Sequence, residues 1–317
     1  MPENPPFRRS SLCVVGNINR DVKLHGVPPS SGLLRDGETS VSNVTETIGG
    51  GGANSACAAA ALGARVHFAG KVGADALGEL LRKVMERHGV KTHLAHDPNC
   101  ATGTTAALGF KNGQRHFLSC LPNNQNLRFE DLDLAALDRS RHLLRADVWF
   151  SRAMLEQGNR LLFSEARKRK VMTSLDINFD PAWSTGSARA VRHRKQLLRN
   201  VLGLVDLAHG NVRELCEFTD CPNLKAALKR LADWGVGAVV VHLGSKGAGY
   251  FRDGQCFIEP ADRARRAVHS TGTGDVLSIC MILLEARKDL SIQQKLRLSN
   301  RVVREFMEGR RTLIPSL

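Results

Sequence analysis

The chain has 317 residues, of which 42% are hydrophobic, and it carries a formal net charge of +14 at pH 7. This length suits one large α/β unit with a smaller appendage, and the charge favours an anionic partner, either a nucleic acid or a nucleotide. Aromatic residues make up only 5% of the chain, and the basic clusters at 167–170, 192–195 and 263–266 contain no interleaved aromatic residues. We therefore expect no nucleic-acid interface.

The eight cysteines form no CxxC pair, and the longest apolar run, residues 276–284, is too short to cross a bilayer. No apolar signal core follows the basic residues near the start of the chain. We therefore expect reduced thiols, a cytoplasmic location and no membrane partner. No nearby carboxylate or cysteine completes a set of metal ligands with His93 and His96, so we expect no metal site there.

The first predicted element is a short buried strand at residues 11–15, which ends at Gly16 and leads into the sequence NINRD. Open α/β sheets bind ligands at the carboxyl ends of their strands. Asn19 and Asp21 are therefore candidate binding residues. Stabilisation of a turn explains the same residue types equally well.

Two segments have the character of a small β appendage. Residues 22–47 show no helical period, and residues 100–121 contain Asn112-Gly113 between two β-rich runs, a strong hairpin signal. We assign both segments to a β lid. Residues 1–21, 48–99 and 122–317 would then form the large α/β domain.

A glycine-rich segment, IGGGGANSACAAAALGA, lies between the two lid segments at residues 48–64. Its glycines allow a ligand to approach the backbone, and the alanines that follow favour a helix. The spacing fits neither the dinucleotide pattern nor a phosphate loop ending in Gly-Lys-Ser/Thr. We interpret Gly50, Gly51 and Asn54 as a polyol-binding turn, with a plain helix start as the alternative.

After Gly73 the pattern alternates between strands and helices, which predicts a mainly parallel sheet covered on both faces. Helical periods occupy residues 77–85, 155–167, 188–202, 224–234, 276–284 and 292–307. Strand-like runs occupy residues 147–150, 171–175, 205–208 and 238–242.

Polar residues follow three of these predicted strands. They are Asp176 and Asn178, then Asn211 and Glu214, then the loop Gly244-Ser245-Lys246-Gly247. Carboxylate and amide oxygens suit Mg²⁺, which combines a few protein oxygens with water and phosphate.

The last glycine loop reads STGTGD at residues 270–275 and runs directly into an apolar helix. A helix start leaves unpaired N–H donors and a partial positive charge, which suit a phosphoryl group. Gly272, Thr273 and Gly274 would form this anion hole, with Asp275 beside it as a base. We expect the helix start to favour the ionised form of Asp275. Simple helix capping is the alternative interpretation.

Nearly the whole chain resembles the carbohydrate kinases of the ribokinase-like (PfkB) superfamily. The resemblance is carried chiefly by GGGGAN with the following ALGARVHFAGKVGADALG, and by STGTGD. It implies an α/β fold with three layers, α/β/α, a mainly parallel central sheet and a small β-sheet lid. It also implies the transfer of the γ-phosphoryl group of ATP to a sugar hydroxyl, with ATP and a small sugar as ligands, Mg²⁺ as cofactor, and a homodimer formed through the lid.

The resemblance also implies roles for individual residues. Those expected to bind the sugar are Asn19, Asp21, Gly50, Gly51 and Asn54. Those expected to face the nucleotide are Asn211, Glu214, His242, Gly244, Ser245, Gly247 and Asn300, with Asn211 and Glu214 also organising Mg²⁺ through water and phosphate. Asp275 would be the base, beside the anion hole of residues 272–275.

Three departures from the family pattern affect these expectations. His269 replaces the usual acidic residue of the last motif, so we expect little activation by a monovalent cation such as K⁺. His242 replaces a frequent threonine, and the region around Asn300 lacks the usual small residues beside the adenine. A nucleoside kinase of the same fold and a non-catalytic sugar- or nucleoside-binding protein remain as alternatives.

Overall fold

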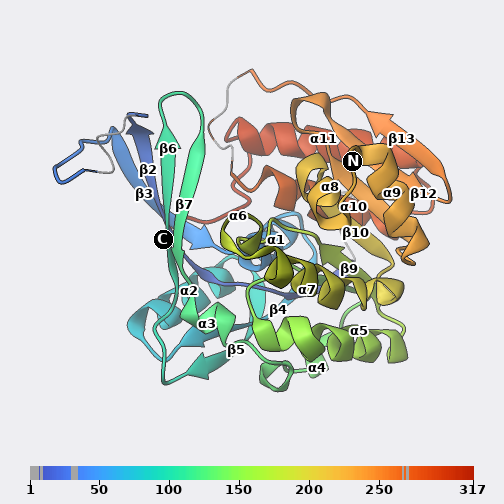
Figure 1. The fold of residues 1–317 in the computed structure, drawn as a ribbon, viewed down its shortest axis with the longest axis horizontal. Helices are drawn as coiled ribbons and strands as arrows, with labels where there is room; N and C mark the ends of the chain where they lie inside the picture. The colour runs from blue at the N-terminus through green and yellow to red at the C-terminus, as the bar shows by residue number, and fades with distance from the viewer. Residues whose placement is uncertain (1–6, 8–9, 30–34, 266–267, 269–270) are drawn as a thin grey trace, which may run out of the picture.

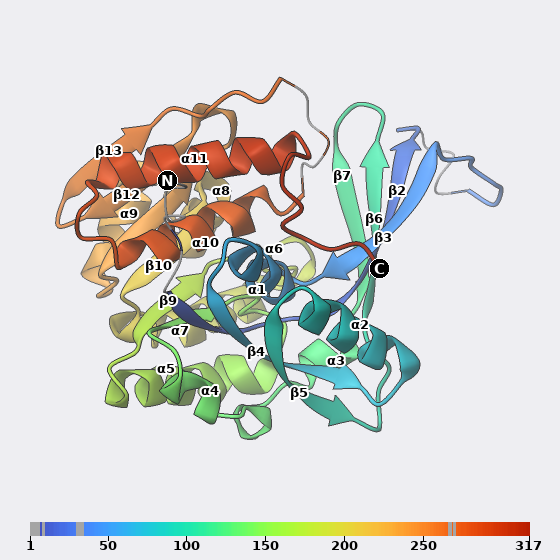
Figure 2. The same cartoon turned by 180° about the vertical axis from the view of Figure 1, so that it is seen from behind.

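The computed structural model describes residues 7, 10–29, 35–265, 268 and 271–317. Two sheets organise this part of the chain, as Figures 1 and 2 show from opposite sides. The large sheet has nine strands in the order β13-β12-β11-β10-β9-β8-β1-β4-β5, and the small sheet has four in the order β3-β2-β6-β7. Helices cover both faces of the large sheet, so the expected three-layer α/β/α fold is confirmed.

The strands from β5 to β11 in the large sheet are parallel, and β12 and β13 extend its far edge in antiparallel pairs. In chain order the nine strands are β1 (Ser11–Val15), β4 (Arg65–Gly73), β5 (Val90–Asp97), β8 (His142–Arg145), β9 (Met172–Asp176), β10 (Leu207–Asn211), β11 (Ala238–His242), β12 (Ala248–Arg252) and β13 (Gln255–Glu259). Every residue of the interior strand β1 is buried, because helices cover both of its faces.

Two apolar cores separate the sheet from its helix layers. One core contains side chains of α1 (Gly51–Ala61), α2 (Ala76–Arg87), α10 (Thr273–Glu285) and α11 (Ile292–Met307). The other contains side chains of α4 (Ala135–Asp138), a π-helical turn η3 (Met154–Gly158), α5 (Asn159–Lys168), α7 (Ala188–Arg199), α8 (Val212–Thr219) and α9 (Leu224–Asp233). The short helices α3 (Pro122–Gln125) and α6 (Ala182–Thr185) and the 3₁₀ turns η2 (Phe129–Asp131), η4 (Leu202–Leu204) and η5 (Gly244–Lys246) complete the described helices.

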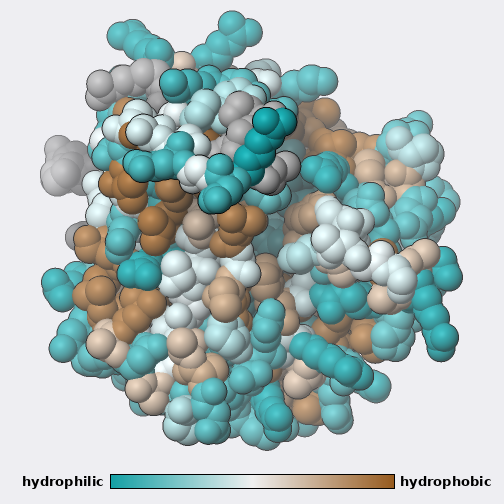
Figure 3. Space-filling model, turned by 60° about the vertical axis from the view of Figure 1, so that its left-hand side comes forward, coloured by the Kyte–Doolittle hydropathy of each residue, from teal (hydrophilic) through white to brown (hydrophobic). Residues whose placement is uncertain are grey.

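The small sheet stands beside one end of the large sheet (Figure 1). Its strands are β2 (Asn19–Val27), β3 (Asn43–Gly49), β6 (Thr104–Phe110) and β7 (Arg115–Cys120). The predicted hairpin at Asn112-Gly113 is confirmed, because β6 and β7 pair antiparallel around it and Gly113 has a φ of 84°. Figure 3, with this side turned forward, shows apolar side chains beside hydrophilic ones; Val44 on β3 and Phe117 and Leu118 on β7 are the exposed large apolar residues of this sheet.

The last described residues return to the edge of the small sheet. Leu317 N donates to Glu46 O at 3.1 Å, Ile48 N donates to Pro315 O at 3.3 Å, and Thr47 forms an antiparallel bridge with Ser316. The tail therefore covers part of the outer edge of β3.

The strand predicted at residues 147–150 is wrong, because the strand of this region is β8, which ends at Arg145. Asp147 has a φ of 54°, a left-handed conformation that cannot continue a strand. The strands predicted at 171–175 and 205–208 lie one to two residues later in the structure, and the strand at 238–242 agrees with β11. The predicted helices correspond to α2, η3 with α5, α7, α9, α10 and α11. Among the described residues, no helix combines the length and apolarity needed to span a membrane.

Candidate active site

The candidate site lies where the parallel strands of the large sheet end and the helices α1 and α10 begin. β8 and β9 end in the buried Arg145 and Asp176, β10 ends in the half-buried Asn211, and the buried Asn17 follows β1. Asp147 follows β8, Asp176 ends β9, and Glu214 lies in the first turn after β10. Asp21 comes from the small sheet and Asp275 from α10. Five carboxyl groups from separate elements therefore meet here.

The start of α10 presents backbone donors beside Asp275. Gly272 caps the helix with a φ of 85°, a conformation that glycine adopts without strain, and Thr273, Gly274 and Asp275 form the first turn. The first bond within the helix runs from Val276 N to Gly272 O at 3.0 Å. In the described part of the chain, no group accepts a hydrogen bond from the N–H of Thr273, Gly274 or Asp275. These donors can bind an anion.

Asp275 is half-buried among other acidic residues. Burial and the charges of Asp147, Glu214 and Asp21 together raise the pKa of Asp275 to about 8, against the opposing effect of the Asn54 amide. The expectation that the helix start favours the ionised carboxylate is therefore wrong for the protein without ligands. Desolvation and like charges outweigh the helix dipole, whose effect is about 0.3–1 kcal/mol at exposed sites.

Asn19 and Asp21 lie on one face of β2, at the end nearest the large sheet. The Asn19 amide Nδ2 donates to Asp21 Oδ1 at 2.8 Å and lies 3.4 Å from Thr105 Oγ1. Burial raises the pKa of Asp21 to about 6, while Lys23 and the Asn19 amide oppose this rise. Asn19 thus orients the carboxyl group of Asp21, and the charge of Asp21 acts on Asp275.

The glycine turn Gly50–Gly52 begins α1 and packs against the end of β1. Gly50 has a φ of 91°, and a Cβ there would lie 2.4 Å from Asn17 O, so glycine is required. Asn54 is 7% exposed, and its Oδ1 has no hydrogen-bond partner among the described residues. The turn and a buried amide oxygen therefore border the same site as Asp21 and Asp275.

Asp147 holds this turn in place. Its Oδ1 accepts from Gly51 N at 3.1 Å, and its Oδ2 accepts from Gly52 N at 2.7 Å and from Asn17 N at 2.9 Å. Burial raises the pKa of Asp147, while these backbone bonds and the charge of Arg145 oppose the rise. Three N–H donors converging on its two oxygens indicate an ionised acceptor.

Sequence reasoning missed Asp147 as a functional residue, because it assigned residues 147–150 to a strand. Asn178, two residues after the end of β9, supports Asp147: its Oδ1 accepts from Asp147 N at 2.8 Å, and its Nδ2 donates to Asp176 Oδ2 at 3.1 Å. Arg145 is fully buried, and its Nε donates to Asn159 Oδ1 at 2.8 Å. The signal available in the sequence was the pair Arg145 and Asp147, two oppositely charged residues at the end of an apolar run.

Asn211 and Glu214 form a capping box at the start of α8. Asn211 Oδ1 accepts from Glu214 N at 2.9 Å, and Asn211 N donates to Glu214 Oε2 at 2.8 Å. Burial raises the pKa of Glu214, and repulsion from Glu214 and Asp275 adds to the raised pKa of the buried Asp176. Glu214 therefore has a structural role and also belongs to the acidic cluster.

The remaining candidate nucleotide residues lie around the end of β11. His242 Nε2 lies 3.0 Å from Ser278 Oγ, and its ring packs against Gly274, so it supports the first turns of α10. Burial lowers the pKa of His242 to about 4 and keeps the ring neutral near pH 7. Gly244 and Ser245 are exposed in the turn η5, and Gly247 has a φ of 112°.

Asn300 lies on α11, and its hydrogen bonds to described residues do not reach the acidic cluster. Its Nδ2 donates to Pro260 O at 2.8 Å and to Glu259 O at 3.2 Å, which ties α11 to the segment after β13. The small sheet contacts the loop before α10 through Arg115, whose Nη1 donates to Thr271 Oγ1 at 3.0 Å. His269 lies outside the described residues.

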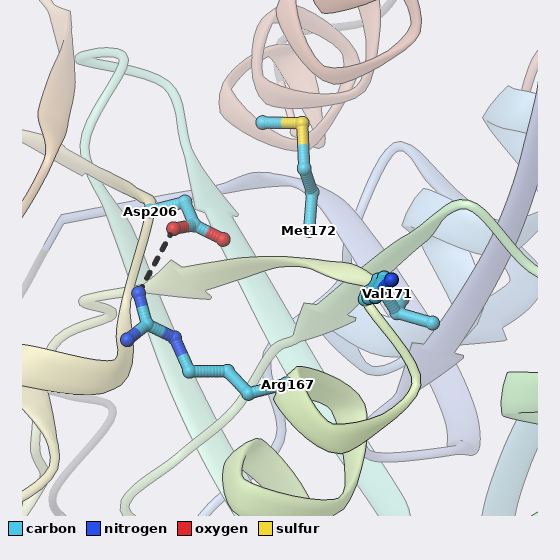
Figure 4. Close-up of a pocket in the computed structure, with 5 residues that line it drawn as sticks. Arg167, Val171, Met172 and Asp206 are labelled. Carbon is cyan, nitrogen blue, oxygen red and sulfur yellow. Dashed lines mark hydrogen bonds and ion pairs between the residues drawn. The ribbon is translucent and has the colours of Figure 1, made fainter.

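Two surface hollows lie away from this site. One of about 350 Å³ is lined by Arg167, Met172 and Asp206, at the opposite ends of β9 and β10, and Figure 4 shows Arg167 paired with Asp206 at 3.3 Å. It contains none of the predicted site residues.

The second hollow, of about 450 Å³, runs along β5 and is lined in part by His93 and His96. His93 Nδ1 lies 2.7 Å from Asp133 Oδ2, and His93 Nε2 lies 2.9 Å from His67 Nδ1. Asp133, 40 residues further along the chain, thus places a carboxylate beside His93. Within the described ranges, no group of three or more potential ligands has the arrangement of a metal site.

Comparison with known proteins assigns the class. The model of the pfkB family carbohydrate kinases matches residues 9–278, and the chain belongs to this family of phosphotransferases with an alcohol group as acceptor. The chain is 26% identical to a ribokinase of Arabidopsis thaliana over 277 residues, which is 84% of this chain and 68% of the relative.

Solved structures share the fold. A candidate ribokinase II from E. coli, in complex with ATP and Mg²⁺, superposes with a TM-score of 0.79 at 18% identity, covering 94% of this chain and 93% of that one. Adenosine kinase from Sinorhizobium meliloti superposes with a TM-score of 0.78 at 19% identity, covering 94% of both chains.

The raised pKa of Asp275 gives a prediction for the dependence of activity on pH. A base must be ionised to accept a proton, so kcat/KM should rise with pH and level off above about 8. Initial rates measured at limiting sugar across pH 6 to 9.5, with Mg²⁺ and ionic strength fixed, would check this. A kcat/KM that is flat across this range would contradict the role of Asp275 as the titrating base.

Proposed function

We propose that the protein is an ATP-dependent sugar kinase that transfers the γ-phosphoryl group of ATP to a hydroxyl of a small sugar. The observation that carries the proposal is the first turn of α10, where the N–H groups of Thr273, Gly274 and Asp275 lie beside the Asp275 carboxyl group. An anion hole and a base in one helical turn suit phosphoryl transfer, which depends mainly on positioning and charge stabilisation.

The residues have separate tasks in this proposal. Asn19, Asp21, Gly50, Gly51 and Asn54 border the sugar; Asn211, Glu214, His242, Gly244, Ser245, Gly247 and Asn300 contribute to the nucleotide side. Asp275 accepts the proton of the attacking hydroxyl, and the first turn of α10 receives the phosphoryl oxygens. Gly272 allows the turn its left-handed cap.

Mg²⁺ fits the chemistry of the acidic cluster. Glu214, Asp176 and Asp275 repel one another in a buried setting, as their raised pKa values indicate, and a divalent cation would relieve this repulsion. Asn211 and Glu214 would hold it largely through water and phosphate. When bound, Mg²⁺ would neutralise charge on the phosphate oxygens.

A coupled assay of ADP release tests the proposed function. The purified chain, ATP and Mg²⁺ would be screened against pentoses, hexoses, sugar acids, sugar phosphates and nucleosides, with Asp275→Asn as the background control. A sugar-dependent rate absent from the variant supports the proposal. Turnover with nucleosides alone would favour a nucleoside kinase, and saturable sugar binding without turnover would favour a binding protein.

We further propose that residues 22–47 and 100–121 form a lid over the sugar, with the remaining residues as the large domain. The contact between Arg115 on β7 and Thr271 supports a lid that reaches the phosphate side of the site. Closure would exclude water from the phosphoryl group. The lid sheet is also the surface we propose for a homodimer.

Lid closure predicts slower proteolysis in the presence of substrate. Cleavage within residues 22–47 and 100–121 should slow at least severalfold when a confirmed sugar and a non-hydrolysable ATP analogue are bound, because closure removes extended backbone from the protease. Mass spectrometry of timed digests would locate the cuts. Equal cutting rates with and without ligands would contradict a moving lid.

A further inference from the structure

We infer that the sugar pocket beside the glycine turn of α1 accepts an uncharged, hydroxyl-rich substrate and rejects one that places a carboxylate or phosphate there. Asp147 is the residue that sets this specificity. The inference rests on the proposed function, because it concerns the acceptor of the same reaction.

The backbone N–H groups of residues 51–54, at the start of α1, are already engaged within the protein. Helix starts bind anions through their first N–H groups. In α1, Asp147 accepts from Gly51 N and Gly52 N at 3.1 and 2.7 Å. Ala53 N donates to Asn17 O at 3.1 Å, and Asn54 N donates to Gly50 O at 2.9 Å. A carboxylate of the protein already occupies the place that a substrate anion would take.

The two helix starts at this site therefore differ. The first N–H groups of α10 have no acceptor within the described ranges, whereas those of α1 are all engaged. Of these two starts, only that of α10 is equipped for the phosphoryl group. At the start of α1 the N–H groups of Gly51 and Gly52 instead face the carboxylate of Asp147, which adds a negative charge there.

The side-chain groups at this pocket that remain available to a ligand are mainly hydrogen-bond acceptors. Asn54 Oδ1 is buried and has no donor among the described residues, and Asp21 and Asp275 add carboxyl oxygens. A buried acceptor without a donor is costly, so this arrangement favours a ligand that brings O–H groups. Sugar hydroxyls satisfy this demand, whereas an ionised carboxylate brings only acceptors.

The charges around the pocket agree with this reading. Asp147, Asp176, Glu214 and Asp275 interact unfavourably with one another, and a substrate anion would add to this repulsion. Lys23 lies on the small sheet, where its attraction is to Asp21. Arg145 is buried behind the pocket and donates to Asn159 and to backbone carbonyls. Neither cation is placed to bind a substrate anion at the α1 turn.

The conformation of Asp147 supports a specific task for its side chain. Its φ of 54° would be adopted more readily by glycine, and the position is 7% exposed. An aspartate in this left-handed conformation indicates that its carboxylate has a role that glycine could not fill. Here that carboxylate accepts hydrogen bonds from three backbone N–H groups.

The test compares matched substrates and matched variants. Fructose would be paired with fructose 6-phosphate, and each further neutral sugar of the panel with its uronic or aldonic acid. The variants are Asp147→Asn and Asp147→Gly, which both tolerate the left-handed backbone. Asp253→Gly is the control, because Asp253 is exposed in the β12–β13 turn and has a similar φ of 50°.

For the wild-type chain, kcat/KM should favour the neutral member of each pair by about 10²-fold or more. Asp147→Gly should reduce that ratio at least tenfold and raise KM for the neutral sugar more than KM for ATP. Asp147→Asn, which keeps one acceptor oxygen, should lie between. Asp253→Gly should leave the ratio within about twofold. Thermal unfolding would verify that each variant is folded, and Asp147→Gly should unfold at a lower temperature than the wild type, because it leaves three backbone N–H groups without their acceptor.

A wild-type preference for the anionic member would overturn the inference while leaving the kinase function intact. An unchanged ratio in both Asp147 variants would remove Asp147 as its determinant and overturn it equally. A wild-type chain that phosphorylates no member of the panel would instead overturn the proposed function, and the inference with it.

Discussion

Asp275→Asn is expected to lower kcat by about 10²-fold or more, the usual scale for loss of a positioned general base. The amide keeps the size of the side chain and its place in the first turn of α10, but it cannot accept the proton of the sugar hydroxyl. KM for sugar and ATP should change much less, because the backbone donors and the glycine turn remain. Steady-state kinetics on a substrate found in the panel would measure this.

Thermal stability provides an independent readout for the same variant. The pKa of Asp275 rises from 3.8 to about 8 on folding, so the folded chain binds this proton more tightly. Its contribution to stability therefore falls as pH rises through that window. The Tm of Asp275→Asn relative to wild type should accordingly increase from pH 6 to pH 8.5. Asp253→Asn should show neither effect, and near-normal kcat in Asp275→Asn would leave Asp275 as a helix-capping residue.

Gly52→Ala should both destabilise the chain and weaken sugar binding. A Cβ at Gly52 would lie 2.6 Å from Gly16 Cα and 2.9 Å from Gly16 C, so the start of α1 would have to move away from the end of β1. Overpacking of this kind costs about 1–3 kcal/mol. Displacement of α1 would also move Asn54, so KM for the sugar should rise about tenfold or more.

Gly203→Ala is the matched control, because Gly203 is exposed in the turn η4 and a Cβ there would meet no atom within 4 Å. It should retain the wild-type Tm within about one degree and the wild-type KM, since surface changes shift stability by about 0.5 kcal/mol or less. Chemical denaturation and sugar titrations would be run on both variants. If Gly52→Ala matched Gly203→Ala in both measurements, close packing between α1 and β1 would not be required.

The sequence predicted those parts of the fold and the site whose signal lies within a few consecutive residues. The segment around Asp275 combined small residues, an acid and an apolar helix, and the structure has a helix starting there. Asn112-Gly113 required left-handed backbone between β-rich runs, which defines a hairpin without reference to distant residues. Asn211 and Glu214 likewise carried their capping box in their own spacing.

Other features depended on contacts between distant segments. β8 is fully buried, but His142 and Arg145 make its sequence look too polar for a buried strand. Arg145 can be buried because Asn159 and backbone carbonyls accept its hydrogen bonds. The sequence of β5 is polar, unlike that of a buried strand, because β5 is an edge strand of the large sheet. Asp147 acquires its role from Gly51 and Gly52, which lie about a hundred residues earlier and meet it only in the folded chain. No local period predicts such a pairing.

The tail at residues 315–317 has a consequence for how the protein behaves in concentrated solution. β3 is an outer strand of the small sheet, and the tail binds the backbone of Glu46, Thr47 and Ile48 on its open side. An uncovered strand edge is a template on which another chain can add a strand. Loss of these three residues by proteolysis would uncover it, next to the exposed Val44 on the same strand. By pairing with β3, residues 315–317 therefore prevent a strand of another chain from pairing with this edge.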